Sequence, residues 1–164
     1  MNNIALIGMP SAGKSTVGVV LAKIIGKKFI DTDLLLQESG KTLPQLIAEL
    51  GVQKFIELEN KTISALSCEN TVIATGGSAV YGEDAMRKIK QIATVVYLRA
   101  PESELEKRME SFNARGVVTL GAKTVTELCA ERAPLYEKYA DIVVTLDAKT
   151  VDEAAETIKK AIGL

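Results

Sequence analysis

Residues 8–16, GMPSAGKST, most constrain the fold, because they directly follow the short apolar run at residues 4–7. The spacing Gly-x4-Gly-Lys-Ser, with a strand before it and an amphipathic helix after it, is typical of a loop that binds nucleotide phosphates. Backbone N–H groups and the helix N-terminus attract phosphate oxygens, the lysine reaches the β- and γ-phosphates, and the serine ligates Mg²⁺. The alternative is a glycine-rich turn with a purely structural role. The predicted nucleotide-binding residues here are Gly8, Ser11, Ala12, Gly13, Lys14, Ser15 and Thr16.

Short apolar runs rich in β-branched residues alternate along the chain with helical patterns. Apolar residues recur with helical spacing within residues 17–24 and 151–158. Further helix starts are indicated by capping boxes or by a proline, at Thr42, Thr124, Thr150 and Pro101. Strands buried on both faces are predicted at residues 4–7, 29–30, 71–74, 94–98 and 142–146. This alternation predicts an α/β fold, a parallel sheet covered by helices on both faces, in one domain over residues 1–164.

Composition excludes several classes of function. The 164 residues carry a formal charge of -1, so no large basic surface for nucleic acid is expected. The absence of histidine excludes Ser-His-Asp and Cys-His catalysis. Two isolated cysteines suit a reducing compartment, and neither a signal peptide nor a run long enough to span a membrane is visible. We therefore expect a cytoplasmic protein with no membrane partner and no nucleic-acid partner.

Acidic and glycine-rich segments follow the second and third predicted strands. In extended geometry Asp31 and Asp33 of FIDTD would share one face, at the carboxyl edge of the sheet where such folds bind ligands. One carboxylate could hold Mg²⁺ through water while the other orients or deprotonates a hydroxyl; the alternative for either is capping of a helix N-terminus. Gly76 and Gly77 would present bare backbone N–H groups at the same edge, or form an ordinary tight turn.

Residues 111–122, SFNARGVVTLGA, resist assignment to a helix or strand. A loop of this length inside a compact domain is often functional, and an active-site lid is one such use. Arg115 lies in this segment, where an arginine could close over the transferring phosphoryl group and stabilise its charge. An ordinary surface loop with a solvated arginine is the alternative.

The sequence resembles the shikimate kinase family along nearly its whole length. The resemblance is carried by GMPSAGKST, FIDTD, KFIELEN, IATGG, the arginine in NARG, and ERAPLYEKYAD. It implies a P-loop fold like that of nucleoside monophosphate kinases, with strand order 2-3-1-4-5, a mobile lid, ATP as donor and a monomer. It further implies that Asp31 binds Mg²⁺ through water and that Asp33 binds the acceptor hydroxyls as the base. The other implied roles are catalysis and phosphate binding for Lys14 and Arg115, adenine stacking for Arg108, and acceptor binding for Gly76, Gly77 and Arg132.

Three positions depart from the family pattern. A second carboxylate-binding arginine is replaced by Ile56, the usual Gly-Gly-Gly ends in Ser78, and the proline after the lid arginine is Gly116. Losing one charge-assisted hydrogen bond costs about 1.5 to 3 kcal/mol, roughly ten- to a hundredfold in acceptor affinity. We do not expect Lys54 to replace the arginine, because residues two apart on a helix point in different directions.

These observations lead to a first hypothesis and two alternatives. The first is an ATP- and Mg²⁺-dependent kinase that phosphorylates shikimate in aromatic amino acid biosynthesis. The second is a related kinase for another polyol or sugar acid, because Ile56 leaves an acceptor carboxylate underpaired. The third is a nucleotide sensor that binds without catalysis.

Overall fold

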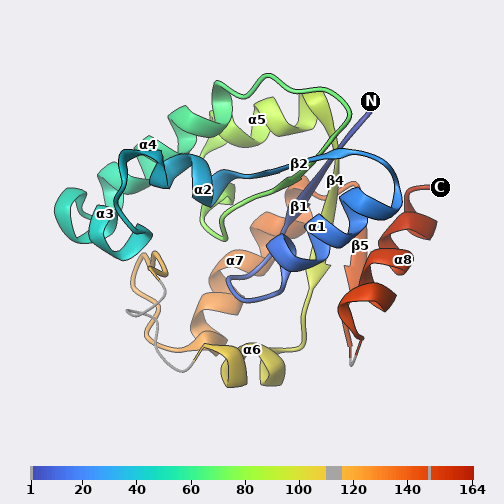
Figure 1. Ribbon diagram of the computed structural model, residues 1–164. Coiled ribbons are helices and arrows are strands. Elements are labelled where there is room, and N and C mark those ends of the chain that lie inside the picture. The colour runs from blue at the N-terminus through green and yellow to red at the C-terminus, as the bar shows by residue number, and fades with distance from the viewer. Residues whose placement is uncertain (1, 110–115, 148) are drawn as a thin grey trace.

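The computed structural model describes residues 2–109, 116–147 and 149–164, and it contains one five-stranded parallel sheet (Figure 1). The strand order is β2-β3-β1-β4-β5, as the family resemblance implied. The central strand β1 pairs with β3 on one side and β4 on the other, so that Leu6 lies between Ala74 and Val96. The strands are β1 Asn3–Ile7, β2 Lys28–Asp31, β3 Thr71–Ala74, β4 Ala93–Arg99 and β5 Ile142–Thr145.

Helices cover both faces of the sheet and make a three-layer structure. The α-helices are α1 Lys14–Ile24, α2 Thr32–Leu36, α3 Leu43–Leu50, α4 Val52–Ser64, α5 Glu83–Ile92, α6 Glu102–Arg108, α7 Val125–Tyr139 and α8 Val151–Ala161. Short 3₁₀ helices, η1 and η2, lie at Gln37–Ser39 and Ala79–Tyr81. Among the described residues, no helix combines the length and the apolar character needed to cross a membrane.

The alternation of side chains along β1 builds two separate cores. Ile4 and Leu6 point to the face covered by α1 and α8, whereas Ala5 and Ile7 point to the face covered by α4, α5 and α7. All five residues of β1 and all four of β3 are buried. The expectation of burial on both faces was wrong for the edge strands: β2 has no fully buried residue, and β5 has only Val144. Edge position explains this, since each edge strand has only one neighbour.

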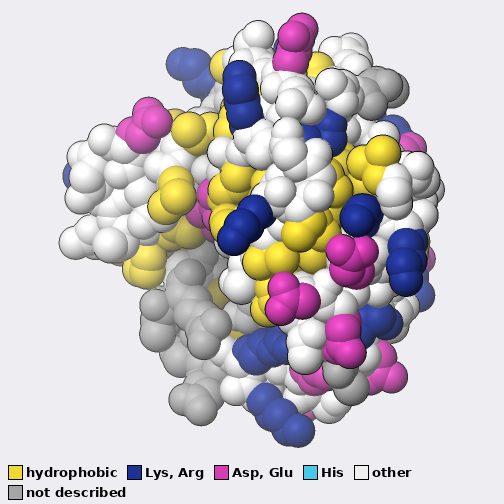
Figure 2. Space-filling view, turned by 45° about the vertical axis from the view of Figure 1, so that its right-hand side comes forward, with side chains coloured by type: hydrophobic (Ala, Val, Ile, Leu, Met, Phe, Trp, Pro, Cys, Tyr) yellow, Lys and Arg dark blue, Asp and Glu magenta, His cyan; other side chains and the backbone are white. Residues whose placement is uncertain are grey.

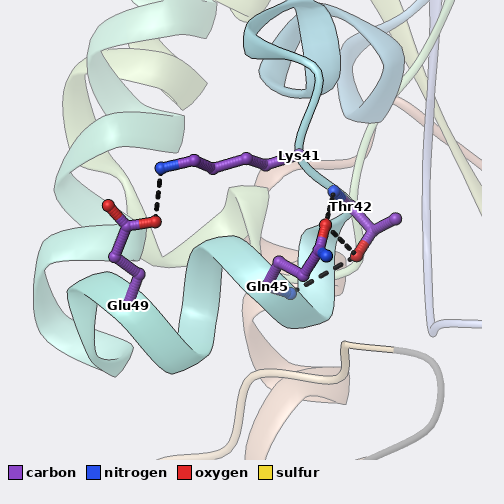
Figure 3. A network of polar contacts seen from close by, with 4 residues as sticks. All are labelled: Lys41, Thr42, Gln45 and Glu49. Atoms are coloured by element: carbon purple, nitrogen blue, oxygen red, sulfur yellow. Dashed lines mark hydrogen bonds and ion pairs between the residues drawn. The ribbon is translucent and has the colours of Figure 1, made fainter.

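Two of the three predicted capping boxes form as complete boxes. In the box at the start of α3, the backbone N–H of Thr42 donates to Gln45 Oε1 over 2.8 Å, and Gln45 N–H donates back to Thr42 Oγ1 (Figure 3). Thr150 and Glu153 form the same arrangement at the start of α8. Thr124 caps α7, but the carboxylate of Glu127 accepts from the neighbouring Lys123 N–H instead. These caps fix where the helices begin.

We predict that Thr42→Ala lowers the free energy of unfolding by about 1 kcal/mol. The change removes the hydroxyl that accepts from Gln45 N–H, a group in the first turn of α3 that has no partner within the helix. Urea denaturation measures this change. Lys41→Ala is the matched control. Lys41 lies just before α3 and forms an exposed ion pair with Glu49 on that helix (Figure 3), and such pairs contribute about 0 to 1 kcal/mol. Equal losses in the two variants would contradict the importance of the cap.

Candidate active site

The loop of residues 8–16, called the phosphate loop below, connects β1 to α1 at the carboxyl edge of the sheet. A Cβ on Gly8 would lie 2.6 Å from the carbonyl oxygen of Leu98, so only glycine allows the loop to pass this close to β4. Gly13 adopts a left-handed conformation, with φ of 94°, and starts α1. The loop therefore delivers the N-terminus of α1 to the edge where the other candidate residues gather.

Lys14 is buried inside this loop. Its Nζ donates hydrogen bonds to the carbonyl oxygens of Gly8 and Met9 over 2.8 and 2.7 Å. Burial lowers the pKa of Lys14 to about 8, with the charge of Asp33 acting in the opposite direction. Lys14 is thus a fixed cation, mostly protonated at neutral pH and with no carboxylate ion pair among the residues described. Such a cation suits the binding of phosphate oxygens.

Asp31 and Asp33 do not share an extended face, so the geometry expected for FIDTD was wrong. The strand ends at Asp31 and the chain turns at once into α2, whose N-cap is Asp31; its Oδ1 accepts from Asp33 N–H over 2.9 Å. Asp33 lies in the first turn of α2. Its carboxylate accepts no hydrogen bond from the described residues, and burial raises its pKa, opposed by the charge of Lys14. Asp33 therefore keeps its acceptor capacity for a ligand.

A cavity of about 60 Å³ lies next to the phosphate loop; it is called the acceptor cavity below. Its wall brings together all four residues that the sequence suggested for acceptor binding, although they come from three different segments of the chain. The residues that matter for the site are Asp33, Gly76, Gly77, Ser78, Val118 and Arg132. Their convergence confirms their predicted proximity, while their individual roles stay predictions.

Gly76 and Gly77 must be glycines in this structure. A Cβ on Gly76 would lie 2.5 Å from Glu59 Oε1 and 2.6 Å from Asp33 Oδ1. A Cβ on Gly77 would lie 2.7 Å from Pro10 and 2.9 Å from Nη1 of Arg132. A side chain at either position would force these neighbours to move, whereas the bare backbone lets charged groups approach from both sides.

Arg132 on α7 is completely buried in the wall of this cavity. Its Nε donates to the hydroxyl of Tyr81 over 3.0 Å, its guanidinium lies over the Tyr81 ring, and its Nη2 donates to the carbonyl oxygen of Val118. Within the described part of the chain, no carboxylate forms an ion pair with it. A buried guanidinium held by neutral groups is a site for an incoming carboxylate.

The remaining predicted residues that the structure describes lie around the phosphate loop. Arg108, in the last turn of α6, donates from Nη1 to the carbonyl oxygen of Ser11 over 3.2 Å and so reaches the loop. Ser15 and Thr16 are exposed in the first turn of α1, where a ligand can reach them. Arg115 and the first part of the predicted lid lie outside the described residues.

The part of the predicted lid that the structure describes begins at Gly116. Its φ of 65° belongs to the left-handed region, which a proline cannot adopt because its ring holds φ near -65°. A Cβ there would also lie 3.0 Å from Leu43 and from the backbone nitrogen of Pro44. Gly116 therefore lets the segment pack against the start of α3, and this explains one of the three departures from the family pattern.

The site offers a few oxygen donors that suit Mg²⁺, with the nucleotide and water supplying the remaining ligands. In the described part of the chain, no three acidic or cysteine side chains are placed to hold a metal ion by themselves. The exposed hydroxyl of Ser15 and the carboxylate of Asp31 are oxygen donors, and Mg²⁺ usually keeps waters and binds substrate phosphates with only one or two protein ligands. The donor set therefore fits Mg²⁺ that arrives with a nucleotide.

Known proteins resemble this chain over almost its full length. A family model described as shikimate kinase matches residues 10–163. Shikimate kinase 2 of Enterobacter sp. (strain 638) is 36% identical over 167 residues, which cover 98% of this chain and 95% of that protein. The chain belongs to the shikimate kinase family. Shikimate kinase of Acinetobacter baumannii, solved in complex with shikimate, is 27% identical with a TM-score of 0.84, covering 99% of this chain and 93% of that one. The Aquifex aeolicus enzyme is 31% identical with a TM-score of 0.84, covering 98% and 95%.

Membership confirms the predicted family and fold class and identifies an ATP-dependent phosphotransferase whose acceptor is an alcohol group of a small molecule. Shikimate kinases use ATP and Mg²⁺, which fits the phosphate loop described above. The two alternatives, a kinase for another polyol and a nucleotide sensor, are not favoured by these matches.

Sequence reasoning missed Glu59, Tyr81 and Tyr136 as parts of the site. Glu59 is 2% exposed, and it lies on the same face of α4 as the buried Phe55 and Ile63. A charged residue on an apolar stripe is a signal that could have revealed it. Tyr136 donates its hydroxyl proton to the carbonyl oxygen of Gly77 over 2.7 Å, and no pattern in the sequence indicates this contact.

We predict that the affinity for ATP falls as the pH rises above about 8. Only protonated Lys14 carries the charge that binds phosphate, and in the free protein its pKa is about 8. Above this value the dissociation constant should rise by up to about tenfold per pH unit. Titration calorimetry between about pH 7.5 and about pH 9.5 measures it. Lys23→Met, a change at an exposed lysine near the other end of α1, should leave the profile unchanged. A flat profile in the unmodified protein would contradict this role of Lys14.

Proposed function

We propose that this chain transfers the γ-phosphoryl group of ATP to a hydroxyl of shikimate. The observation that carries the proposal is Arg132, a buried cation without a carboxylate partner among the described residues, in the same cavity as the unpaired carboxylate of Asp33. An acceptor with a carboxylate at one end and hydroxyls at the other matches both groups. The relative from Acinetobacter baumannii, solved with shikimate, supports this choice.

The proposed chemistry follows from the positions of the side chains. An acceptor hydroxyl oxygen attacks the γ-phosphorus, the bond from that phosphorus to the β-bridging oxygen breaks, ADP leaves, and the hydroxyl proton passes to Asp33. Lys14 holds phosphate oxygens, and the Gly76–Gly77 backbone holds the acceptor. Bound Mg²⁺, with Ser15 and Asp31 as its protein ligands, would neutralise phosphate charge. Because the transition state is loose, positioning and charge stabilisation contribute more than the base.

Further proposed roles rest partly on the family resemblance. We propose that Arg108 stacks on adenine, since it already touches the phosphate loop, and that Arg115 stabilises the transferring group from a lid. We also propose a monomer in the cytoplasm without a nucleic-acid partner. The free cysteines Cys68 and Cys129 support this location, and Figure 2 shows Lys and Arg interspersed with Asp and Glu on the face it presents.

The acceptor specificity tests the proposal directly. In a coupled assay of ADP release, we expect shikimate to be phosphorylated with kcat/KM at least about a hundredfold above neutral polyols, because these lack the carboxylate that Arg132 binds. Asp33→Asn should lower the turnover of shikimate, while Asp84→Asn, a change of the same kind on the exposed start of α5, should not. A preference for a neutral polyol would refute the proposed acceptor, and unchanged turnover in Asp33→Asn would refute the role of that carboxylate.

A further inference from the structure

Glu59 on α4 is a buried carboxyl group with only half of its hydrogen-bonding capacity satisfied. It is 2% exposed, and its Oε2 accepts the hydroxyl proton of Ser78 over 2.5 Å. Its Oε1 is buried and, among the described residues, has no hydrogen-bond partner. Since a buried ionised carboxylate without a partner is costly, the structure favours a neutral, protonated Glu59.

No cation among the described residues forms an ion pair with Glu59, and the residue one turn earlier on α4 is Ile56. That side chain is 8% exposed and packs in an apolar cluster with Phe55, Leu46 and Val118. It is also the position at which the family pattern has an arginine. The lysines of α4, Lys54 and Lys61, are exposed and point elsewhere. The hydroxyl of Ser78, at a position where the family pattern has glycine, is instead the group that contacts the carboxyl.

Three charged groups on other elements face Glu59 without forming an ion pair with it. Burial raises the pKa of Glu59 to about 7, and the charge of Asp33 on α2 adds to the rise. The Ser78 hydrogen bond and the charges of Arg132 on α7 and Lys14 on α1 act in the opposite direction. Glu59 Oε1 and Asp33 Oδ1 lie 2.5 and 2.6 Å from one point above Gly76, so the two oxygens are no more than about 5 Å apart. Two ionised carboxylates at that distance would repel each other.

We propose that Ser78 and Glu59 form a positioning pair that sets the affinity for the acceptor. The hydroxyl of Ser78 holds the Gly76–Ser78 turn through its hydrogen bond to the neutral carboxyl group of Glu59. The pair does this in a chain that has no cation at position 56. This inference rests on the proposed function. The turn is the part of the cavity wall that presents backbone groups to the acceptor. Apart from backbone hydrogen bonds to the 3₁₀ helix η2 that follows it, the turn is attached to other elements by two hydrogen bonds, from Gly76 N–H to Thr32 Oγ1 and from the Tyr136 hydroxyl to the carbonyl oxygen of Gly77. Removing the Ser78 hydroxyl releases the third attachment of the turn.

Ser78→Ala tests the pair. We expect the KM for shikimate to rise about tenfold, while kcat and the KM for ATP stay within about twofold, because the hydrogen bond orients the acceptor wall and not the phosphate loop. Ser64→Ala removes a hydroxyl at the last residue of α4, the helix that carries Glu59, and should change none of these constants. An unchanged KM for shikimate in Ser78→Ala would overturn the proposal, and so would an equal rise in both KM values, which would indicate general damage to the fold.

Glu59→Gln supplies a second readout that a merely structural role would not move. Glutamine still accepts the Ser78 hydrogen bond but cannot ionise, so the KM for shikimate should stay low between about pH 6 and about pH 8.5. In the unmodified protein, the same KM should rise about three- to tenfold as the pH increases from about 6 to about 8.5, because Glu59 then gains a charge next to Asp33. A profile that is identical in the two proteins would overturn the proposal.

These experiments separate the failure of the pair from the failure of the proposed function. If shikimate is not phosphorylated by the unmodified protein, the assay of acceptors shows this before any variant is made. If shikimate is phosphorylated and the variants behave like the unmodified protein, only the Ser78–Glu59 pair is refuted. The variants Ile56→Arg and Ile56→Arg/Ser78→Ala add one more comparison. If Ser78 compensates for the missing cation, removing its hydroxyl should raise the KM for shikimate less in the Ile56→Arg background than in the unmodified protein, and an equal rise in both backgrounds would contradict the compensation.

Discussion

The structure depends on burying four ionisable side chains at one edge of the sheet without joining any two of them in an ion pair: Lys14, Asp33, Glu59 and Arg132. Each is held by neutral groups or left open towards the cavity. Lys14 donates to backbone carbonyl oxygens, Arg132 to Tyr81 and to Val118, and Glu59 accepts from Ser78. If the cations formed ion pairs with the carboxylates, their charges would be neutralised within the protein. In this arrangement, the cations stay available to bind the anionic groups of ligands.

The rest of the fold brings these groups to one edge of the sheet and keeps them from pairing with one another. Parallel strands bring the phosphate loop, the start of α2 and the turn after β3 to one edge, and α7 supplies Arg132 from the side. A Cβ added to Gly8, Gly76 or Gly77 would lie between 2.5 and 2.9 Å from its nearest neighbours, so glycine at these positions lets the neighbouring groups approach the backbone. Ile56 extends the apolar cluster under the cavity, so Arg132 is the cation that lines the described wall and Glu59 is left with a hydroxyl as its partner.

Much of this could be predicted from the sequence, because the signals are local. The phosphate loop and the proximity of Asp33, Gly76 and Gly77 follow from short motifs at strand ends, and the structure brings these residues together. The strand order and the place of Arg132 on α7 were instead implied by the family resemblance. The geometry of Asp31 and Asp33 was not predicted correctly, because β2 ends at Asp31 and Asp33 already lies in the first turn of α2. The contacts of Glu59 with Ser78 and of Arg132 with Tyr81 join residues 19 and 51 positions apart, and no local pattern specifies such pairs.

The central claim is that the buried cation of Arg132 takes its counter-ion from the acceptor. Titration calorimetry of shikimate with Arg132→Met measures this directly, because methionine keeps an unbranched apolar chain and removes the charge. We predict that the dissociation constant for shikimate rises at least about a hundredfold. The dissociation constant for ATP should stay within about threefold and the protein should remain folded by circular dichroism. Equal affinity for shikimate in the folded variant and in the unmodified protein would contradict the account.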